Sequence, residues 1–152
     1  MRVSDILDHK GREVVTVPAM TSVAGLARLL RTRRIGAVVV VDNNHAMIGI
    51  VSERDIVHHI ARDGEAALHA TVSEIMSAPV EICAPDEDLK HVMATMTQKR
   101  VRHVPVIDHG RLAGIVSIGD VVKHRLAENN LEINVLRDAA LAHAVAIAGP
   151  GG

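Results

Sequence analysis

The chain has 152 residues, and although 48% are hydrophobic, it contains no Phe, Trp or Tyr. Its core must therefore be aliphatic, and it has no aromatic ring on which a base could stack, which argues against single-strand nucleic-acid binding. The formal net charge of −1, from 17 basic and 18 acidic residues, provides no general basic surface for nucleic acid.

The composition indicates a cytoplasmic protein. The single cysteine, Cys83, cannot form an internal disulfide, which fits a reducing compartment. The N-terminus lacks the apolar segment of a signal peptide. No apolar run approaches the roughly 20 residues that a membrane-spanning helix needs, so we expect no membrane association.

Patterning in the first half predicts alternating helices and strands. An entirely apolar strand over residues 38–41 indicates burial on both faces, and Thr21 or Ser22 is a suitable helix cap. The predicted elements are a short helix or turn over 3–7, a loop over 8–12, a strand over 14–17, a helix over 23–34, a strand over 38–41, a turn over 42–45, a strand over 47–51 and a helix from Ser52 to about Arg62.

The second half repeats this order. Its predicted elements are a strand over 80–83, a helix opened by residues 85–88, a strand over 104–107, a turn over 108–110 and a strand over 112–116. The repeat offset is 66 residues before the turn and 65 after it, so the second turn is one residue shorter. Such repetition predicts two pseudo-symmetric units that share an interface.

The most informative part of the repeat is a Gly-Ile-Val-Ser-x-x-Asp segment, which begins at Gly49 and again at Gly114. Each copy predicts a buried strand that leads directly into a helix. A helix start attracts anions such as phosphate, and an Asp one turn later can accept hydrogen bonds from a ribose diol. The alternative is that Ser and Asp only cap the helix.

These segments resemble those of tandem CBS (cystathionine-β-synthase) domains, or Bateman modules. The strand-entry segments 34–42 and 100–108 carry the same resemblance, which covers roughly residues 3–127. It implies an α/β fold in which two pseudo-symmetric CBS repeats pack into one module, with a cleft on each side of the pseudo-twofold axis. We assign residues 1–68 to the first repeat, 69–127 to the second, and 128–152 to a C-terminal helix and tail.

The resemblance also implies composite ligand sites, in which the Asp of one repeat faces the strand entry of the other. Asp120 and Ser117 match the ribose-binding aspartate and its adjacent hydroxyl residue. On the family pattern they share one cleft with Val14, Gly36 and Ala37.

The other cleft is implied in the same way. Asp55 and Ser52 match the aspartate and hydroxyl residue of the first repeat, and share their cleft with Val80, Arg102 and His103. Arg102 and His103 lie where the family places phosphate-binding side chains, from which either cleft is within reach. His103 has packing or hydrogen bonding as its alternative role.

Adenine would lie against an aliphatic chain such as Ile50 or Ile115. Arg54 is a candidate for neutralising a phosphate, with a solvated helix position as its alternative. Because Gly119 takes its place in the second copy, the two sites should differ in charge. Lys10 and Arg12, in the expected loop, are weaker phosphate-binding candidates.

We expect neither a metal site nor catalytic residues. The ten histidines lack the spacing of zinc ligands, and His59 recurs as His124 at the repeat offset, which favours a structural role. Cys83 aligns with Val17 and is interpreted as a small buried residue. No nucleophile-elbow or Ser-His-Asp arrangement is evident.

The C-terminal segment predicts an extended helix with a heptad-like stripe. Residues 121–145 contain neither Gly nor Pro, and the stripe, with a polar break at Asn129, comprises Val122, Leu126, Asn129, Ile133, Leu136, Ala140, His143 and Ile147. We expect the helix to pack on a second copy, or alternatively on its own module, and residues 148–152 to be frayed.

Together these expectations describe a regulatory module that binds AMP, ATP or an NAD-type ligand, requires no cofactor, forms a homodimer and modulates an unidentified protein. A ligand-independent dimerisation scaffold is the alternative, because the same strands and helix would serve it. A nucleotide-processing enzyme is a third class, and it needs a general base within reach of the ligand.

Overall fold

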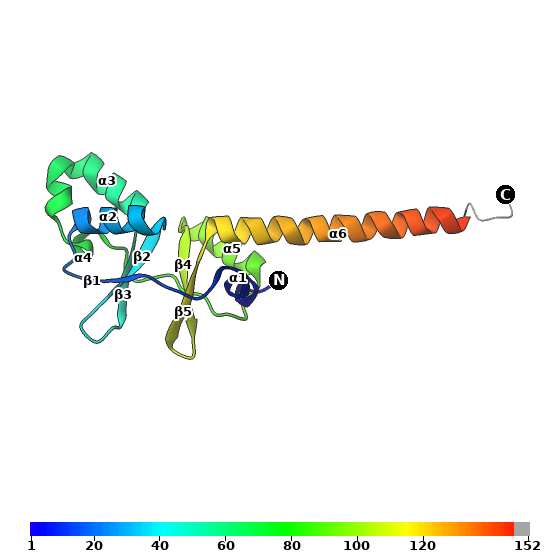
Figure 1. The fold of residues 1–152 in the computed structure, drawn as a ribbon, viewed down its shortest axis with the longest axis horizontal. Helices are drawn as coiled ribbons and strands as arrows, with labels where there is room; N and C mark the ends of the chain where they lie inside the picture. Colours follow the sequence, from blue (N-terminus) through cyan, green and yellow to red (C-terminus); the bar gives the residue numbers. More distant parts are fainter. Residues whose placement is uncertain (148–152) are drawn as a thin grey trace.

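The computed structural model describes residues 1–147, so the expectation of a frayed tail at 148–152 lies outside the described part. The fold is mixed α/β, as predicted, with two small sheets side by side and one long helix leading away from them (Figure 1). The elements are α1 (Val3–Lys10), β1 (Thr16–Pro18), α2 (Val23–Arg33), β2 (Ala37–Val41), β3 (Met47–Ser52), α3 (Glu53–Asp63), a 3₁₀ helix η1 (Gly64–His69), α4 (Val72–Ile75), α5 (Leu89–Lys99), β4 (His103–Asp108), β5 (Arg111–Ser117) and α6 (Ile118–Ile147).

The first sheet has the order β1-β2-β3. β1 runs parallel to β2, and β2 pairs antiparallel with β3. Every residue of β2 is buried, which confirms the interpretation of its apolar run. Ser22 caps α2 by accepting a hydrogen bond from the backbone N–H of Gly25, 3.0 Å away.

The second sheet differs from the prediction. β4 and β5 pair antiparallel, but the strand expected over residues 80–83 is reduced to one parallel bridge between Cys83 and Val106. This bridge corresponds, at the repeat offset, to the pairing of Val17 with Val40 in the first sheet. Prolines at 79 and 85 bracket the segment, and a proline has no N–H with which to extend a ladder.

The prediction of a loop over residues 8–12 is also wrong for residues 8–10, which are helical. α1 continues to Lys10 and ends at Gly11, whose φ of 99° is accessible to glycine. The Gly11 N–H donates to the carbonyl of Leu7 at 2.8 Å. His9 and Lys10 thus occupy the last turn of the helix, where positive charge is favourable.

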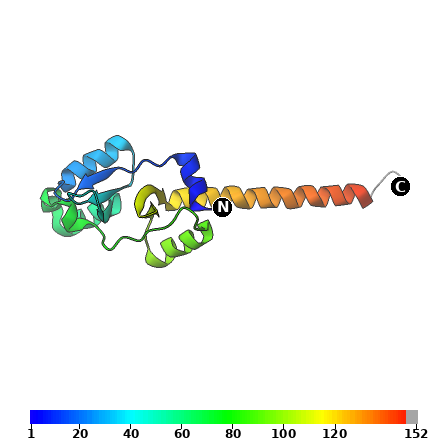
Figure 2. The same cartoon turned by 90° about the horizontal axis from the view of Figure 1, so that it is seen from below.

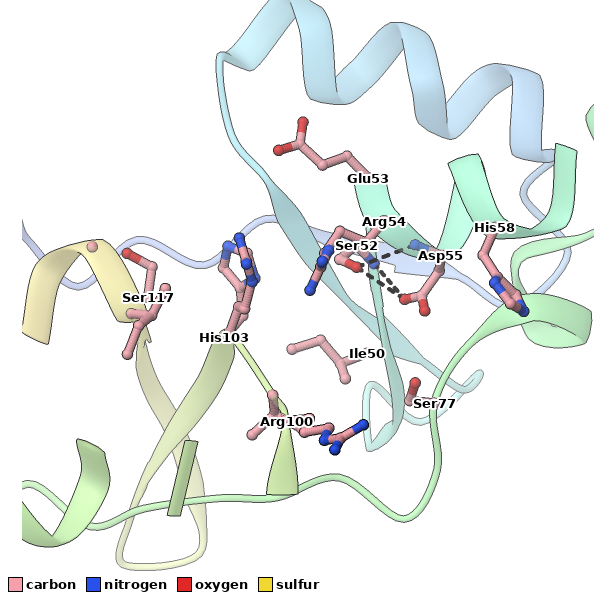
Figure 3. A pocket seen from close by; sticks show the side chains of 14 residues that line it. Ile50, Ser52, Glu53, Arg54, Asp55, His58, Ser77, Arg100, His103 and Ser117 are labelled. Carbon is pink, nitrogen blue, oxygen red and sulfur yellow. Dashed lines mark hydrogen bonds between the residues drawn. The ribbon is translucent and has the colours of Figure 1, made fainter. Parts of the chain in front are cut away.

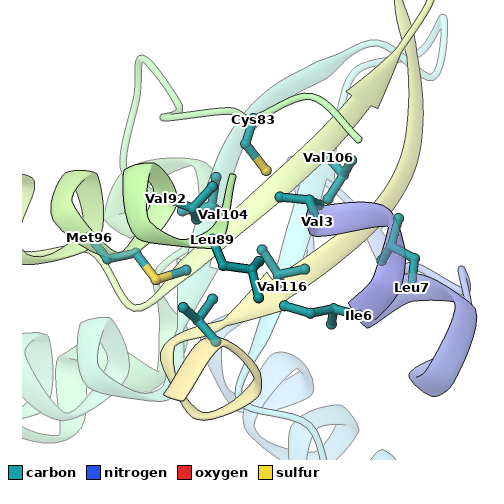
Figure 4. Close-up of a cluster of buried hydrophobic side chains, with 11 residues drawn as sticks. Val3, Ile6, Leu7, Cys83, Leu89, Val92, Met96, Val104, Val106 and Val116 are labelled. Atoms are coloured by element: carbon teal, nitrogen blue, oxygen red, sulfur yellow. The ribbon is translucent and has the colours of Figure 1, made fainter. Parts of the chain in front are cut away.

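The short helices that precede the two repeats exchange partners. α1 packs into the core of the second repeat, where its Val3, Ile6 and Leu7 join a buried cluster with residues of α5, β4 and β5 (Figure 4). α4 packs into the core of the first repeat through Val72 and Ile75. The repeat boundaries drawn from the sequence remain predictions, and the packing units cross them.

The long helix α6 leaves the module after its first turns. These turns pack against α5 and α1, and the helix then extends away from both sheets (Figure 2). Residues 129–145 are all exposed, so the alternative in which the helix folds back on its own module is not found. Among the stripe positions, Ile133 and Leu136 are more than half exposed, while the side chain of Ile147 lies outside the described part.

Candidate functional site

Both repeated Ser-x-x-Asp segments form reciprocal caps at a helix start. In α3, the N–H of Asp55 donates to Ser52 Oγ, and the N–H of Ser52 donates to Asp55 Oδ2 at 2.8 Å. Ser117 and Asp120 repeat this arrangement at the start of α6, with distances of 3.1 and 2.9 Å. The capping interpretation is therefore correct, but it does not use the whole carboxylate. Within residues 1–147, the hydrogen bonds to the carboxylates of Asp55 and Asp120 all engage Oδ2, and none engages Oδ1.

A cleft of about 600 Å³ lies beside the start of α3, between the two repeats (Figure 3). We call it the Asp55 cleft. It brings together six of the predicted site residues, namely Ile50, Ser52, Arg54, Asp55, Arg102 and His103. Ser117 of the second repeat also lines it, although the family pattern assigned Ser117 to the other site. Val80 is not among its lining residues.

Several lining residues were not predicted. They are Glu53, His58, Ser77, Arg100, Val101, Ile118 and Gly119. Arg100 ends α5 in the left-handed conformation, with φ of 55°, as Arg34 does at the end of α2, 66 residues earlier. That internal repetition of a basic residue just ahead of each buried strand was the sequence signal for Arg100. Ser77 joins the site through a two-way backbone bridge with Ile50, at 3.1 and 2.8 Å.

Positive charge is concentrated in this cleft. Arg54, Arg100 and Arg102 line it, and the same three residues line an adjoining hollow of about 290 Å³. Glu53 and Asp55 are the carboxylates that line the Asp55 cleft. Because guanidinium groups bind phosphate oxygens through paired hydrogen bonds, this arrangement suits a phosphorylated ligand.

His103 connects the two halves of the site. A Cβ on Gly36 would lie 3.1 Å from its Nε2 and 3.6 Å from a carboxylate oxygen of Glu53, so the ring lies against the strand entry of the first repeat. Burial lowers the pKa of His103, with the nearby Glu53 opposing this shift. The ring is therefore mainly neutral at pH 7.

The residues predicted for the other site are arranged differently. The Asp120 site consists of Asp120, Ser117 and Ile115, and Lys10 reaches it from the end of α1. Lys10 Nζ donates to Asp120 Oδ2 at 2.7 Å and to the carbonyl of Ile115 at 3.1 Å. Burial acts to raise the pKa of Asp120, but the hydrogen bonds from Lys10 and Ser117 outweigh it and lower that pKa.

The other residues predicted for the Asp120 site are Gly36, Ala37 and Val14. Gly36 lines a hollow of about 580 Å³ between α2 and α3, and its carbonyl accepts a hydrogen bond from Glu53 N–H at 3.0 Å. Ala37 is a buried residue that begins β2, and Val14 lies ahead of β1. Neither is among the residues lining the Asp55 cleft.

The rest of residues 1–147 contains no arrangement that indicates a metal site. There, no group of three or more His, Cys, Asp or Glu side chains is placed to hold a metal ion, and no helix is long and apolar enough to cross a membrane. Cys83 is buried, and burial raises the pKa of its thiol to about 12. His59 and His124 each donate from Nδ1 to the helix carbonyl four residues earlier, at 2.9 and 3.0 Å.

Comparison with known proteins gives the family. The CBS domain family model matches residues 3–62 and 72–127. The CBS-domain protein ATU1752 from Agrobacterium tumefaciens is 48% identical, with a TM-score of 0.80, over 82% of this chain and 92% of that one. The Pyrobaculum aerophilum protein PAE2072, solved in complex with AMP, is 26% identical, with a TM-score of 0.69, over 79% of this chain and 89% of that one.

A third structure is the CBS domain pair of MJ0100, in complex with 5′-methylthioadenosine and S-adenosyl-L-methionine. It is 27% identical, with a TM-score of 0.74, over 84% of this chain and 98% of that one. The chain spans 63% of the length of one curated relative and 33% of another, at 30% and 36% identity. On the family match and the paired repeats, the chain belongs to the CBS domain family and forms a tandem CBS, or Bateman, module.

Proposed function

We propose that this chain is a regulatory module that binds a phosphorylated adenosine ligand, such as AMP, ATP or an NAD-type dinucleotide, in the Asp55 cleft. The observation that carries the proposal is the combination of a capped carboxylate with three arginines around one cleft between the repeats. Support comes from PAE2072, which was solved with AMP, and from MJ0100, which was solved with two other adenosine compounds.

Each part of such a ligand has a matching group in the cleft. The open Oδ1 of Asp55 accepts a hydrogen bond from a ribose hydroxyl. Ile50 provides an aliphatic surface for adenine, as a chain without aromatic residues requires. The arginines face the phosphate and favour it over the positively charged sulfonium of S-adenosylmethionine, since like charges repel.

Regulation follows from the position of the cleft between the repeats. A bound ligand contacts Asp55 of the first repeat and Arg102 of the second, so it favours the arrangement in which both reach it. A ligand shifts a conformational equilibrium only by its difference in affinity for the two states. We propose that a partner protein, not yet identified, reads this shift in the cytoplasm, the location that the single buried Cys83 favours.

We further propose a homodimer formed through α6. Ile133 and Leu136 occupy neighbouring core positions of the heptad stripe and are exposed in the single chain. Glu132 precedes this pair and Arg137 follows it, at the two flanking positions that form ion pairs between parallel helices. This charge pattern favours a parallel pair of α6 helices from two copies.

The ultraviolet spectrum of the purified protein tests ligand binding directly. Because the chain has no Trp, Tyr or Phe, it is almost transparent from about 260 to 280 nm. A band near 260 nm that is released on denaturation would reveal a co-purified nucleotide, which mass spectrometry can identify. If the spectrum is flat, the protein is titrated with AMP, ATP and NAD by equilibrium dialysis.

Asp55→Asn tests the role of the Asp55 carboxylate in nucleotide binding. Asn retains an oxygen to cap α3 but loses the charge, so we expect the fold to persist and nucleotide affinity to fall at least tenfold. Asp63→Asn, at the other end of α3, is the control and should leave affinity unchanged. A wild-type dimer that binds none of the three nucleotides would support the scaffold, and turnover of bound nucleotide would support the enzyme.

A further inference from the structure

Lys10 places its ammonium group against two acceptors of the Asp120 site, although it binds the same oxygen, Oδ2, that accepts from the Ser117 N–H. Its ammonium group donates both to the carboxylate that corresponds to the ribose-binding position and to the backbone carbonyl of Ile115. The lysine and aspartate side chains are each about one-third exposed or less, so the contact is partly shielded from water. The chain therefore supplies its own cation where a ligand's hydrogen-bond donors would lie.

The first repeat provides an internal comparison. Within residues 1–147, no lysine or arginine forms a salt bridge with Asp55, although its cap is the same as that of Asp120. The backbone N–H of Ser77, not a charged side chain, donates to the carbonyl of Ile50, the counterpart of Ile115. At the carboxylate and the strand carbonyl, the two sites thus differ by one ammonium group.

Lys10 is held in place by its helix. Ile6 and Leu7, from the preceding turn of α1, are buried in the core of the second repeat. α1 also lies beside the first turns of α6 (Figure 2), where the rings of His9 and His124 meet edge to face with centroids 5.7 Å apart. Because the backbone of Lys10 is fixed by this packing, its pairing with Asp120 restricts only the side chain.

We propose that Lys10 is an internal competitor that makes the two ligand sites unequal. The Asp55 cleft fills first, and the Asp120 site accepts an adenosine ligand only when Lys10 withdraws from the carboxylate. This inference rests on the proposed function. Its physical basis is that Lys10 and Asp120 attract each other as opposite charges, whereas a ribose hydroxyl that replaced Lys10 would bring a hydrogen bond to the carboxylate but no positive charge.

The proposed competition is tested by replacing Lys10 with Met, whose unbranched side chain is one atom shorter and carries no charge. Amide NMR spectra recorded during a titration with AMP separate the sites, because Ile50 reports on the Asp55 cleft and Ile115 on the Asp120 site. We expect Lys10→Met to raise affinity at the Asp120 site by about tenfold, the factor that loss of such a hydrogen-bonded competitor supplies. Affinity at the Asp55 cleft should not change.

Arg12→Met is the matched control. Arg12 lies two residues away and pairs with Asp8, so its replacement removes one positive charge from the same segment without disturbing Asp120. It should alter neither site. If Arg12→Met raised affinity at Ile115 as much as Lys10→Met does, the effect would come from general charge, and the proposal would be wrong.

Other results overturn the inference in distinct ways. Weaker binding at Ile115 in Lys10→Met would make Lys10 a ligand contact, and unchanged binding would make its pairing irrelevant to occupancy. If the wild-type protein shifts at neither reporter, the proposed function fails at the Asp55 cleft. The role of Lys10 as a competitor is still tested in that case. A response at Ile115 in Lys10→Met would support that role, and the absence of a response would refute it.

Discussion

Leu7 of α1 lies directly over Gly114 of β5, so that a Cβ on this glycine would come within 2.6 Å of Leu7 Cδ2. Met76, at the end of α4, covers Gly49 of β3 in the same way. The glycine of each repeated segment is therefore required for the close approach of a helix that belongs, in sequence order, to the other repeat. The motif that forms the candidate site also joins the repeats.

Gly114→Ala should destabilise the fold. The added methyl group would displace Leu7 from the core, and such overpacking costs about 1–3 kcal/mol in free energy of unfolding. Urea denaturation followed by far-ultraviolet circular dichroism measures the change, since the chain has no Trp, Tyr or Phe to follow by fluorescence. Gly119→Ala is the control because its Cβ would meet only Ser117 Oγ at 3.6 Å. Equal stability of the two variants would contradict this account of the packing.

The sequence predicted most of the helices and strands because their signals are local and occur in both repeats. The apolar run of β2 is buried at every position, and the one-residue difference between the repeats is found in the turns. The caps at Ser52 and Ser117 also lie where the motif predicts them. Each prediction depends on a few adjacent residues, and the second repeat checks the first.

Contacts between residues far apart in the sequence were harder to predict. Nothing near Lys10 in the sequence indicates a contact with Asp120, because the contact depends on α1 packing into the second repeat. The same exchange explains why Ser77, which follows α4, reaches Ile50 of the first repeat. The strand predicted over residues 80–83 is limited to one bridge for a local reason, namely the flanking prolines. The prediction gave the apolar pattern more weight than those prolines.

Arg54→Gln should weaken phosphate binding in the Asp55 cleft. Arg54 is one of three arginines there, and loss of one charge-assisted contact should reduce affinity for AMP about tenfold and for adenosine much less. Equilibrium dialysis of both compounds at low and high salt measures the difference, which salt should diminish. Arg111→Gln, at the start of β5 and away from the cleft, is the control. An equal loss for adenosine would assign Arg54 a structural role.

The lowered pKa of His103 makes stability depend on pH. The folded protein binds a proton at this ring less readily than the unfolded chain does. The contribution of neutral His103 to the free energy of unfolding is therefore complete above the unfolded pKa of about 6.5, and it is lost as the pH falls below that value. Wild-type protein should therefore lose stability relative to His103→Gln between pH 7.5 and 5.5. Urea denaturation of both proteins at several pH values measures this. A difference in stability that stays constant with pH would show that the ring is not held neutral.

Leu136→Glu should dissociate the proposed dimer without unfolding the module. Leu136 is 70% exposed in the single chain, so a charge there costs little in the monomer, whereas two copies would face each other across a parallel pair of helices. Sedimentation equilibrium should give a dimer for the wild type and a monomer for the variant. Leu131→Glu is the matched control, because Leu131 is exposed on the same helix but lies off the stripe. If both variants remain dimeric, α6 is not the interface, and its apolar residues serve another partner.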